Sequence, residues 1–108
     1  MEKTIVIDGK NVVFKSTGAT PLRYKQQFGK DFFAELAKME KAFNAKEASY
    51  ESLDFEAFYN IAWTLAKTAD KEIASPLEWL DTFDEFPIVD IIPELQDILA
   101  RMLNSKKK

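Results

Sequence analysis

The first sixteen residues contain two short apolar runs, one on either side of a turn signal. β-Branched and aromatic residues precede and follow Asp8-Gly9-Lys10, and Asp-Gly between two such runs is a strong signal for a tight β-hairpin. We therefore expect strands at about residues 3 to 8 and 11 to 16. Because a two-stranded hairpin is marginally stable alone, it must pack on helices or add to a strand of a partner.

A short helix is predicted after the hairpin. Thr20 is a good N-cap, and Pro21 suits the first helical position, where a missing N–H costs nothing. The helix is expected to reach Phe28, and Gly29 can supply a left-handed cap at its C-terminal end.

A second helix is predicted to begin after Asp31, which can cap it, and to end near Asn44. Its apolar side chains fall on one face at helical spacing: Phe32, Leu36, Met39 and Phe43. Residues 45 to 52 are polar and show no periodicity, so they indicate a loop.

The clearest helical pattern starts at Asp54. Apolar side chains repeat every three or four residues, as on a buried helix face: Phe55, Phe58, Tyr59, Ala62, Leu65, Ala66 and Ala69. The segment Ser75-Pro76-Leu77-Glu78 then combines an N-cap serine, a proline at the first helical position and the glutamate of a capping box. A short helix that carries Trp79 and Phe83 is expected to follow.

The last segment predicts a strongly amphipathic helix. Its apolar side chains form one stripe: Ile88, Ile91, Ile92, Leu95, Ile98, Leu99, Met102 and Leu103. Charged residues, among them Asp90, Glu94 and Asp97, occupy the opposite side. Pro93 lies inside this pattern, so either the regular hydrogen-bond ladder begins near Asp90 or the first turns are kinked.

These patterns together predict a mainly α protein, with an N-terminal β-hairpin at about residues 3 to 16 and about five helices, the last one amphipathic. The 108 residues, 46% of them hydrophobic, fit a single domain over 1–108, with 104–108 as a frayed basic tail. The apolar run before Asp8 is too short for a signal peptide or a membrane span, so we expect a cytoplasmic protein with no membrane partner.

Composition removes most catalytic chemistry. The chain has no cysteine and no histidine, so it lacks thiolate nucleophiles, disulfides, the usual general base and the commonest metal ligand. Its three glycines are too scattered for a phosphate-binding loop. The net charge of -3 argues against nucleic acid as a partner, because phosphate contacts are made mainly by Lys and Arg. We expect neither enzyme activity nor a cofactor.

Acidic residues leave one alternative chemistry open. Asp81, Asp84 and Glu85 form a tight cluster, and carboxylate oxygens are ligands for magnesium, so an enzyme using carboxylates and a metal stays an alternative. Charge is also uneven along the chain: residues 1 to 46 hold nine Lys or Arg and five Asp or Glu, whereas residues 47 to 105 hold three and thirteen. This asymmetry favours solvated faces, head-to-tail self-contact or a basic partner.

Short motifs along nearly the whole chain carry a family resemblance. They are the N-terminal hairpin, Gly18-Ala19-Thr20-Pro21-Leu22-Arg23-Tyr24, Phe28-Gly29-Lys30-Asp31-Phe32 and Glu78-Trp79-Leu80-Asp81-Thr82-Phe83. In these the sequence resembles the tail assembly chaperones of long-tailed phages and prophages of Gram-positive bacteria. The resemblance implies a small, mainly helical protein that binds the tape measure protein, keeps it soluble and helps recruit tail tube protein subunits. It implies a place in the host cytoplasm and absence from the mature virion.

The family supplies no residue map, so the candidate site rests on the apolar residues themselves. The stripe of the last helix can complete the core or be offered to another chain, and both alternatives are open. We expect a surface for a partner or for self-association, as in a homo-oligomer, built from Trp79, Phe83, Ile91, Leu95, Ile98, Leu99 and Met102. A small phage or prophage regulatory or antitoxin-like module that binds another protein is the alternative function.

Overall fold

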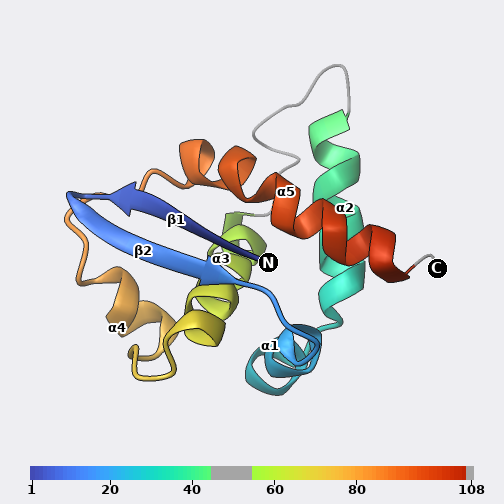
Figure 1. The fold of residues 1–108 in the computed structure, drawn as a ribbon, viewed down its shortest axis with the longest axis horizontal. Helices are drawn as coiled ribbons and strands as arrows, with labels where there is room; N and C mark the ends of the chain where they lie inside the picture. The colour runs from blue at the N-terminus through green and yellow to red at the C-terminus, as the bar shows by residue number, and fades with distance from the viewer. Residues whose placement is uncertain (45–54, 107–108) are drawn as a thin grey trace.

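The computed structural model describes residues 1–44 and 55–106. The described residues form two strands and five helices: β1 (Glu2–Ile7), β2 (Lys10–Lys15), α1 (Thr20–Phe28), α2 (Phe32–Asn44), α3 (Phe55–Ala69), α4 (Pro76–Leu80) and α5 (Ile88–Lys106) (Figure 1). The predicted architecture, a mainly α protein with an N-terminal β-hairpin and an amphipathic last helix, is confirmed. The predicted loop at 45–52 and the Asp54 cap lie outside the described residues.

The hairpin turns on two residues, Asp8 and Gly9. Both have positive φ angles, 53° and 74°, as the tight turn that matches the twist of two antiparallel strands requires. Because Lys10 already belongs to β2, each strand lies one residue earlier than predicted. The strands pair antiparallel, with Ile5 opposite Val12.

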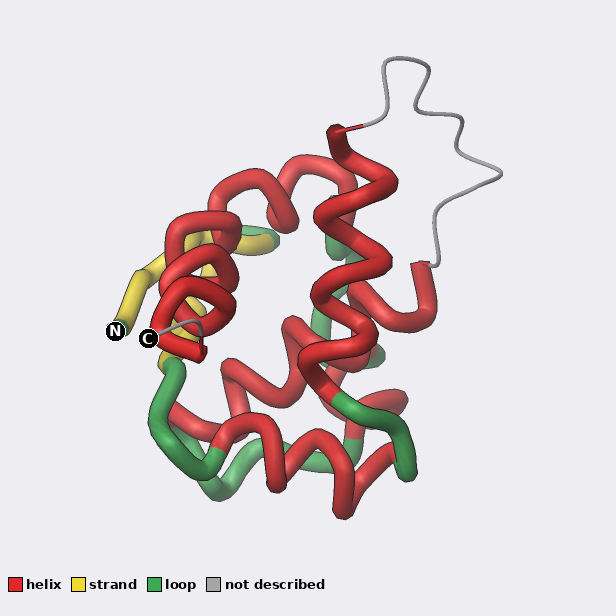
Figure 2. The backbone as a smooth tube through the Cα atoms, turned by 90° about the vertical axis from the view of Figure 1, so that its right-hand side faces the viewer, coloured by secondary structure: helices red, strands yellow, loops and turns green. Residues whose placement is uncertain are grey.

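One face of the hairpin is covered and the other is open. Ile5, Ile7 and Phe14 are buried, whereas Val6 on the outer face is 67% exposed. Helix α3 packs against β2 and α5 packs against β1. Figure 2 shows the two strands at one side of the molecule, with α2 toward the other. The buried side chains of the strands and helices form one continuous core cluster.

Two of the predicted helix caps are confirmed. Gly29 ends α1 with a φ of 72° in the left-handed region. The Asp31 carboxylate Oδ1 accepts hydrogen bonds from the N–H groups of Phe33 at 2.9 Å and Ala34 at 3.4 Å, at the start of α2. Asp31 thereby satisfies main-chain donors that a helix start leaves without partners.

The predicted cap of α1 is wrong. Ala19 is the N-cap, and Thr20 is already the first helical residue and fully buried. The Thr20 hydroxyl accepts a hydrogen bond from the Thr17 N–H at 3.0 Å and lies 3.4 Å from the hydroxyl of Thr68 in α3. Contact between α1 and α3 therefore draws this hydroxyl into the interior instead of leaving it at the helix end.

The capping box before α4 is only half formed. Ser75 is the N-cap residue and Pro76 follows it as predicted, but the Ser75 side chain makes no capping hydrogen bond to any described residue. The Ser75 carbonyl instead accepts a hydrogen bond from the Trp79 N–H at 2.8 Å. The main chain thus starts this short helix without the side-chain bond.

Helix α5 begins at Ile88, where the predicted apolar stripe begins, so of the two alternatives the one that starts the ladder near Asp90 is wrong. At the other end α5 continues to Lys106, past residue 104, where a frayed tail was predicted to start. The Ile91 N–H donates to the Pro87 carbonyl at 3.0 Å, so the ladder is established before Pro93. Since proline has no N–H, the Val89 carbonyl loses its usual helical donor inside the helix.

Candidate protein-binding surface

The structure places the predicted contact residues in the core. Six side chains are buried, with exposed fractions of 8% or less, and Met102 is partly buried against them. The six are Trp79, Phe83, Ile91, Leu95, Ile98 and Leu99. Of the two roles that the sequence left open for the stripe, this conformation has the core role, and partner binding by these residues stays a prediction. The physical reason is that the hairpin and α3 leave apolar faces that the stripe of α5 covers.

Trp79 in α4 and Phe83 just after it link α4 to the hairpin and to the connection between α4 and α5. Their rings meet edge to face at a centroid distance of 5.3 Å, and both contact Phe86, at 5.4 Å and 5.3 Å. The ammonium group of Lys10, from the hairpin, lies 5.2 Å from the centroid of the Phe83 ring. Aromatic packing of this geometry adds to simple burial, so these two residues fix α4 in place.

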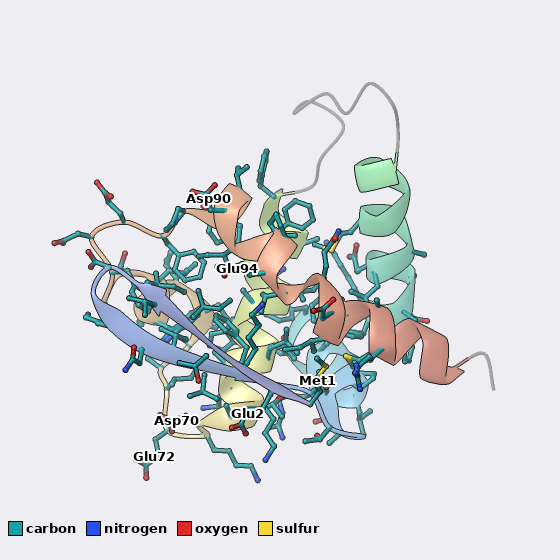
Figure 3. All side chains as sticks on the ribbon, turned by 45° about the horizontal axis from the view of Figure 1, so that its top comes forward. Met1, Glu2, Asp70, Glu72, Asp90 and Glu94 are labelled. Carbon is teal, nitrogen blue, oxygen red and sulfur yellow. The ribbon has the colours of Figure 1, made fainter. Side chains whose placement is uncertain are left out.

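A different set of apolar residues faces solvent. Met1, Leu22, Phe33 and Met102 line a groove of about 710 Å³ together with Pro21 and Arg101. Leu22 is 59% exposed and Met1 45% exposed. Figure 3 shows Met1 close to α1 and to the C-terminal half of α5. We call this set the Leu22 groove.

Local hydrogen bonds bring these distant residues together. The Ser16 N–H donates to the Met1 carbonyl at 2.9 Å, which holds the chain start beside β2. The Thr17 hydroxyl then accepts from the Ala19 N–H at 3.2 Å. These hydrogen bonds fix the segment between β2 and α1 and so set the direction of α1. Leu22 therefore lines the same groove as Met1. A neighbouring hollow of about 300 Å³, which Pro21 and Leu22 also line, continues the apolar surface.

Sequence reasoning missed the Leu22 groove except for Met102. Leu22 lies on α1 among polar and charged residues. An isolated apolar residue on a polar helix face is the one sequence signal that could have indicated this groove. The other contributors come from the chain start, from α2 and from the end of α5. Such a site is assembled by tertiary packing, so no local pattern in the sequence predicts it.

The acidic cluster does not assemble into a metal site. Asp81, Asp84 and Glu85 are all exposed, and the Asp84 N–H donates to the Asp8 carboxylate at 3.0 Å, which ties the turn to the α4–α5 connection. Within 1–44 and 55–106, the structure contains no group of three or more acidic, histidine or cysteine side chains placed to hold a metal. None of the described helices is long and apolar enough to cross a membrane.

Comparison with known proteins gives no relative. No family model matches the chain, and neither the curated proteins nor the solved structures include a significant match.

Proposed function

We propose that this protein is a tail assembly chaperone that binds the phage tape measure protein, keeps it soluble and helps recruit tail tube subunits. The observation that carries the proposal is the Leu22 groove, an exposed apolar surface on a small helical protein. Contiguous exposed apolar surface of this kind marks sites of protein association. The resemblance of the hairpin and connector motifs to this chaperone family names the partner.

The groove suits an amphipathic helix as its occupant. Leu22, Phe33 and Met102 provide apolar walls, which can take side chains spaced three and four residues apart. The Arg101 guanidinium and the Met1 ammonium add positive charge at the rim, which favours acidic residues beside the apolar stripe of the partner. A long helical rod exposes such stripes before a tube surrounds it, and covering them opposes aggregation.

The same proposal places the protein in the host cytoplasm during tail assembly and outside the mature virion. Charged side chains such as Asp90 and Glu94, on the first turns of α5 (Figure 3), are exposed. They leave an acidic face opposite the buried stripe, which is available to a basic surface of a tail tube subunit while the groove holds the rod.

Co-expression with the tape measure protein encoded beside this chain tests the proposal. We expect the tape measure protein to move from the insoluble to the soluble fraction and to co-elute with this protein on size-exclusion chromatography. If the tape measure protein stays insoluble and this protein elutes alone, the chaperone function is wrong. A regulatory, antitoxin-like role would then be the function to test.

A further inference from the structure

A second groove, of about 530 Å³, runs along the free edge of β2. Its walls are β2 on one side and, on the other, the end of α3, the following turn and α4. The apolar residues that line it include Val12, Val13, Ala69, Ile73, Trp79 and Phe83. The small side chains of α3 at this point leave room between the strand edge and α4. We call this hollow the β2-edge groove.

The hydrogen-bond pattern of the hairpin leaves a row of main-chain N–H and C=O groups of β2 pointing into this groove. Met1 and Ser16 exchange two hydrogen bonds, at 2.9 Å and 3.3 Å, so they form a hydrogen-bonded pair. Such pairs alternate with non-bonded pairs along an antiparallel ladder. In the observed register the non-bonded residues of β2 are therefore Asn11, Val13 and Lys15. Their N–H and C=O groups point away from β1.

No hydrogen bond from the described part of the chain satisfies these outward groups of Asn11, Val13 and Lys15. A row of donors and acceptors at strand spacing is matched by another extended main chain. The edge therefore selects a strand, not a helix or a small molecule, as the occupant.

The walls limit the occupant to one strand. At the hairpin end, the Lys10 ammonium donates to the Thr82 carbonyl at 2.6 Å, and the Asp84 N–H donates to Asp8 at 3.0 Å, so the groove is closed there. At the other end, Glu2 and Asp70 lie near the end of α3 (Figure 3) and line the opening. A second copy of the hairpin would bring its own α3 and α4 against these walls, whereas a single extended segment fits beside β2.

The charges that line the β2-edge groove indicate which side chains the bound segment can carry. The positive charges of Lys10 and Lys15 are balanced by the carboxylates of Glu2 and Asp70, and the floor contains Trp79 and Phe83. A buried side chain with an unpaired charge is strongly disfavoured on such a floor. We propose that the β2-edge groove binds an extended, uncharged segment of a partner protein, with β-branched apolar side chains at alternate positions, as an added third strand. This inference is independent of the proposed chaperone function.

The probe is the peptide acetyl-Thr-Val-Thr-Val-Thr-amide, with binding followed by chemical-shift changes in the full chain. We expect saturable shifts at the Trp79 indole and the Val13 amide. Val13→Pro removes one outward N–H, a change that an edge strand tolerates, and we expect roughly tenfold weaker binding. Val6→Pro makes the same change on the outward edge of β1 and is the matched control, with unchanged binding.

Two modified peptides test the proposal further. The same peptide with N-methyl groups on the amides that face β2 should not bind the unaltered protein, which tests the strand pairing even if Val13→Pro fails to fold. Replacing both valines of the peptide by aspartate or by lysine should weaken binding roughly tenfold. The proposal is overturned if the peptide gives no shifts at millimolar concentration, if Val6→Pro weakens binding as much as Val13→Pro, or if sedimentation shows a dimer of the unaltered protein that Val13→Pro dissociates.

Discussion

Individual residues with special backbone geometry explain where several elements begin and end. Gly29 has a φ of 72°, a conformation that costs other residues energy because Cβ meets the neighbouring carbonyl. Asp31 then starts α2 through its carboxylate. Both roles are readable from the sequence because they depend on residues within one turn of each other. Thr20 is the counter-example, because its partner Thr68 is 48 residues away.

Gly29→Ala should lower the free energy of unfolding by about 1 kcal/mol. The added methyl group would meet nothing within 4 Å among the described atoms, so the cost is that of the backbone angle alone. Gly18→Ala is the matched control, since its methyl group also meets nothing within 4 Å of the described chain and Gly18 has no positive φ. Urea unfolding of both variants measures the difference. Equal effects at the two sites would contradict this explanation of the α1 end.

At the scale of the element, α5 shows how far a hydrophobic pattern can be interpreted. The stripe correctly predicted an amphipathic helix, and the sequence left its role open between core and contact surface. Which role the stripe has depends on the elements that pack against it. Helix α5 packs on β1, α2 and α3, and Leu95 and Ile98 have no exposed surface. Periodicity identifies which residues share a face, but it does not say what covers that face.

Leu95→Ala should destabilise the protein by about 2 to 5 kcal/mol, because it removes buried atoms and leaves a cavity. Val89→Ala, on the same helix but with 48% of the valine exposed, should change the free energy of unfolding by less than about 0.5 kcal/mol. Thermal and urea unfolding give both values. If Leu95→Ala were as mild as Val89→Ala, α5 would not be the part of the core that the structure shows.

At the scale of the whole molecule, the fold was predictable and the candidate site mostly was not. Turn chemistry, caps and periodicity act over a few residues, and they gave the hairpin and all five described helices in order. The Leu22 groove joins Met1, Leu22 and Met102 across almost the full length of the chain. Its existence depends on how α1 and α5 are packed, which no short window of sequence contains.

A pair of exposed leucines tests the proposed binding of the tape measure protein in the Leu22 groove. Leu22 is 59% exposed inside the groove, and Leu77 is 73% exposed on α4, outside it. The measurement is the soluble fraction of the tape measure protein co-expressed with the unaltered chain, with Leu22→Glu or with Leu77→Glu. We predict that Leu22→Glu lowers that fraction roughly tenfold, because a carboxylate would be buried at the contact, and that Leu77→Glu does not change it. Full solubilisation by Leu22→Glu, or an equal loss with Leu77→Glu, would show that the Leu22 groove does not bind the tape measure protein.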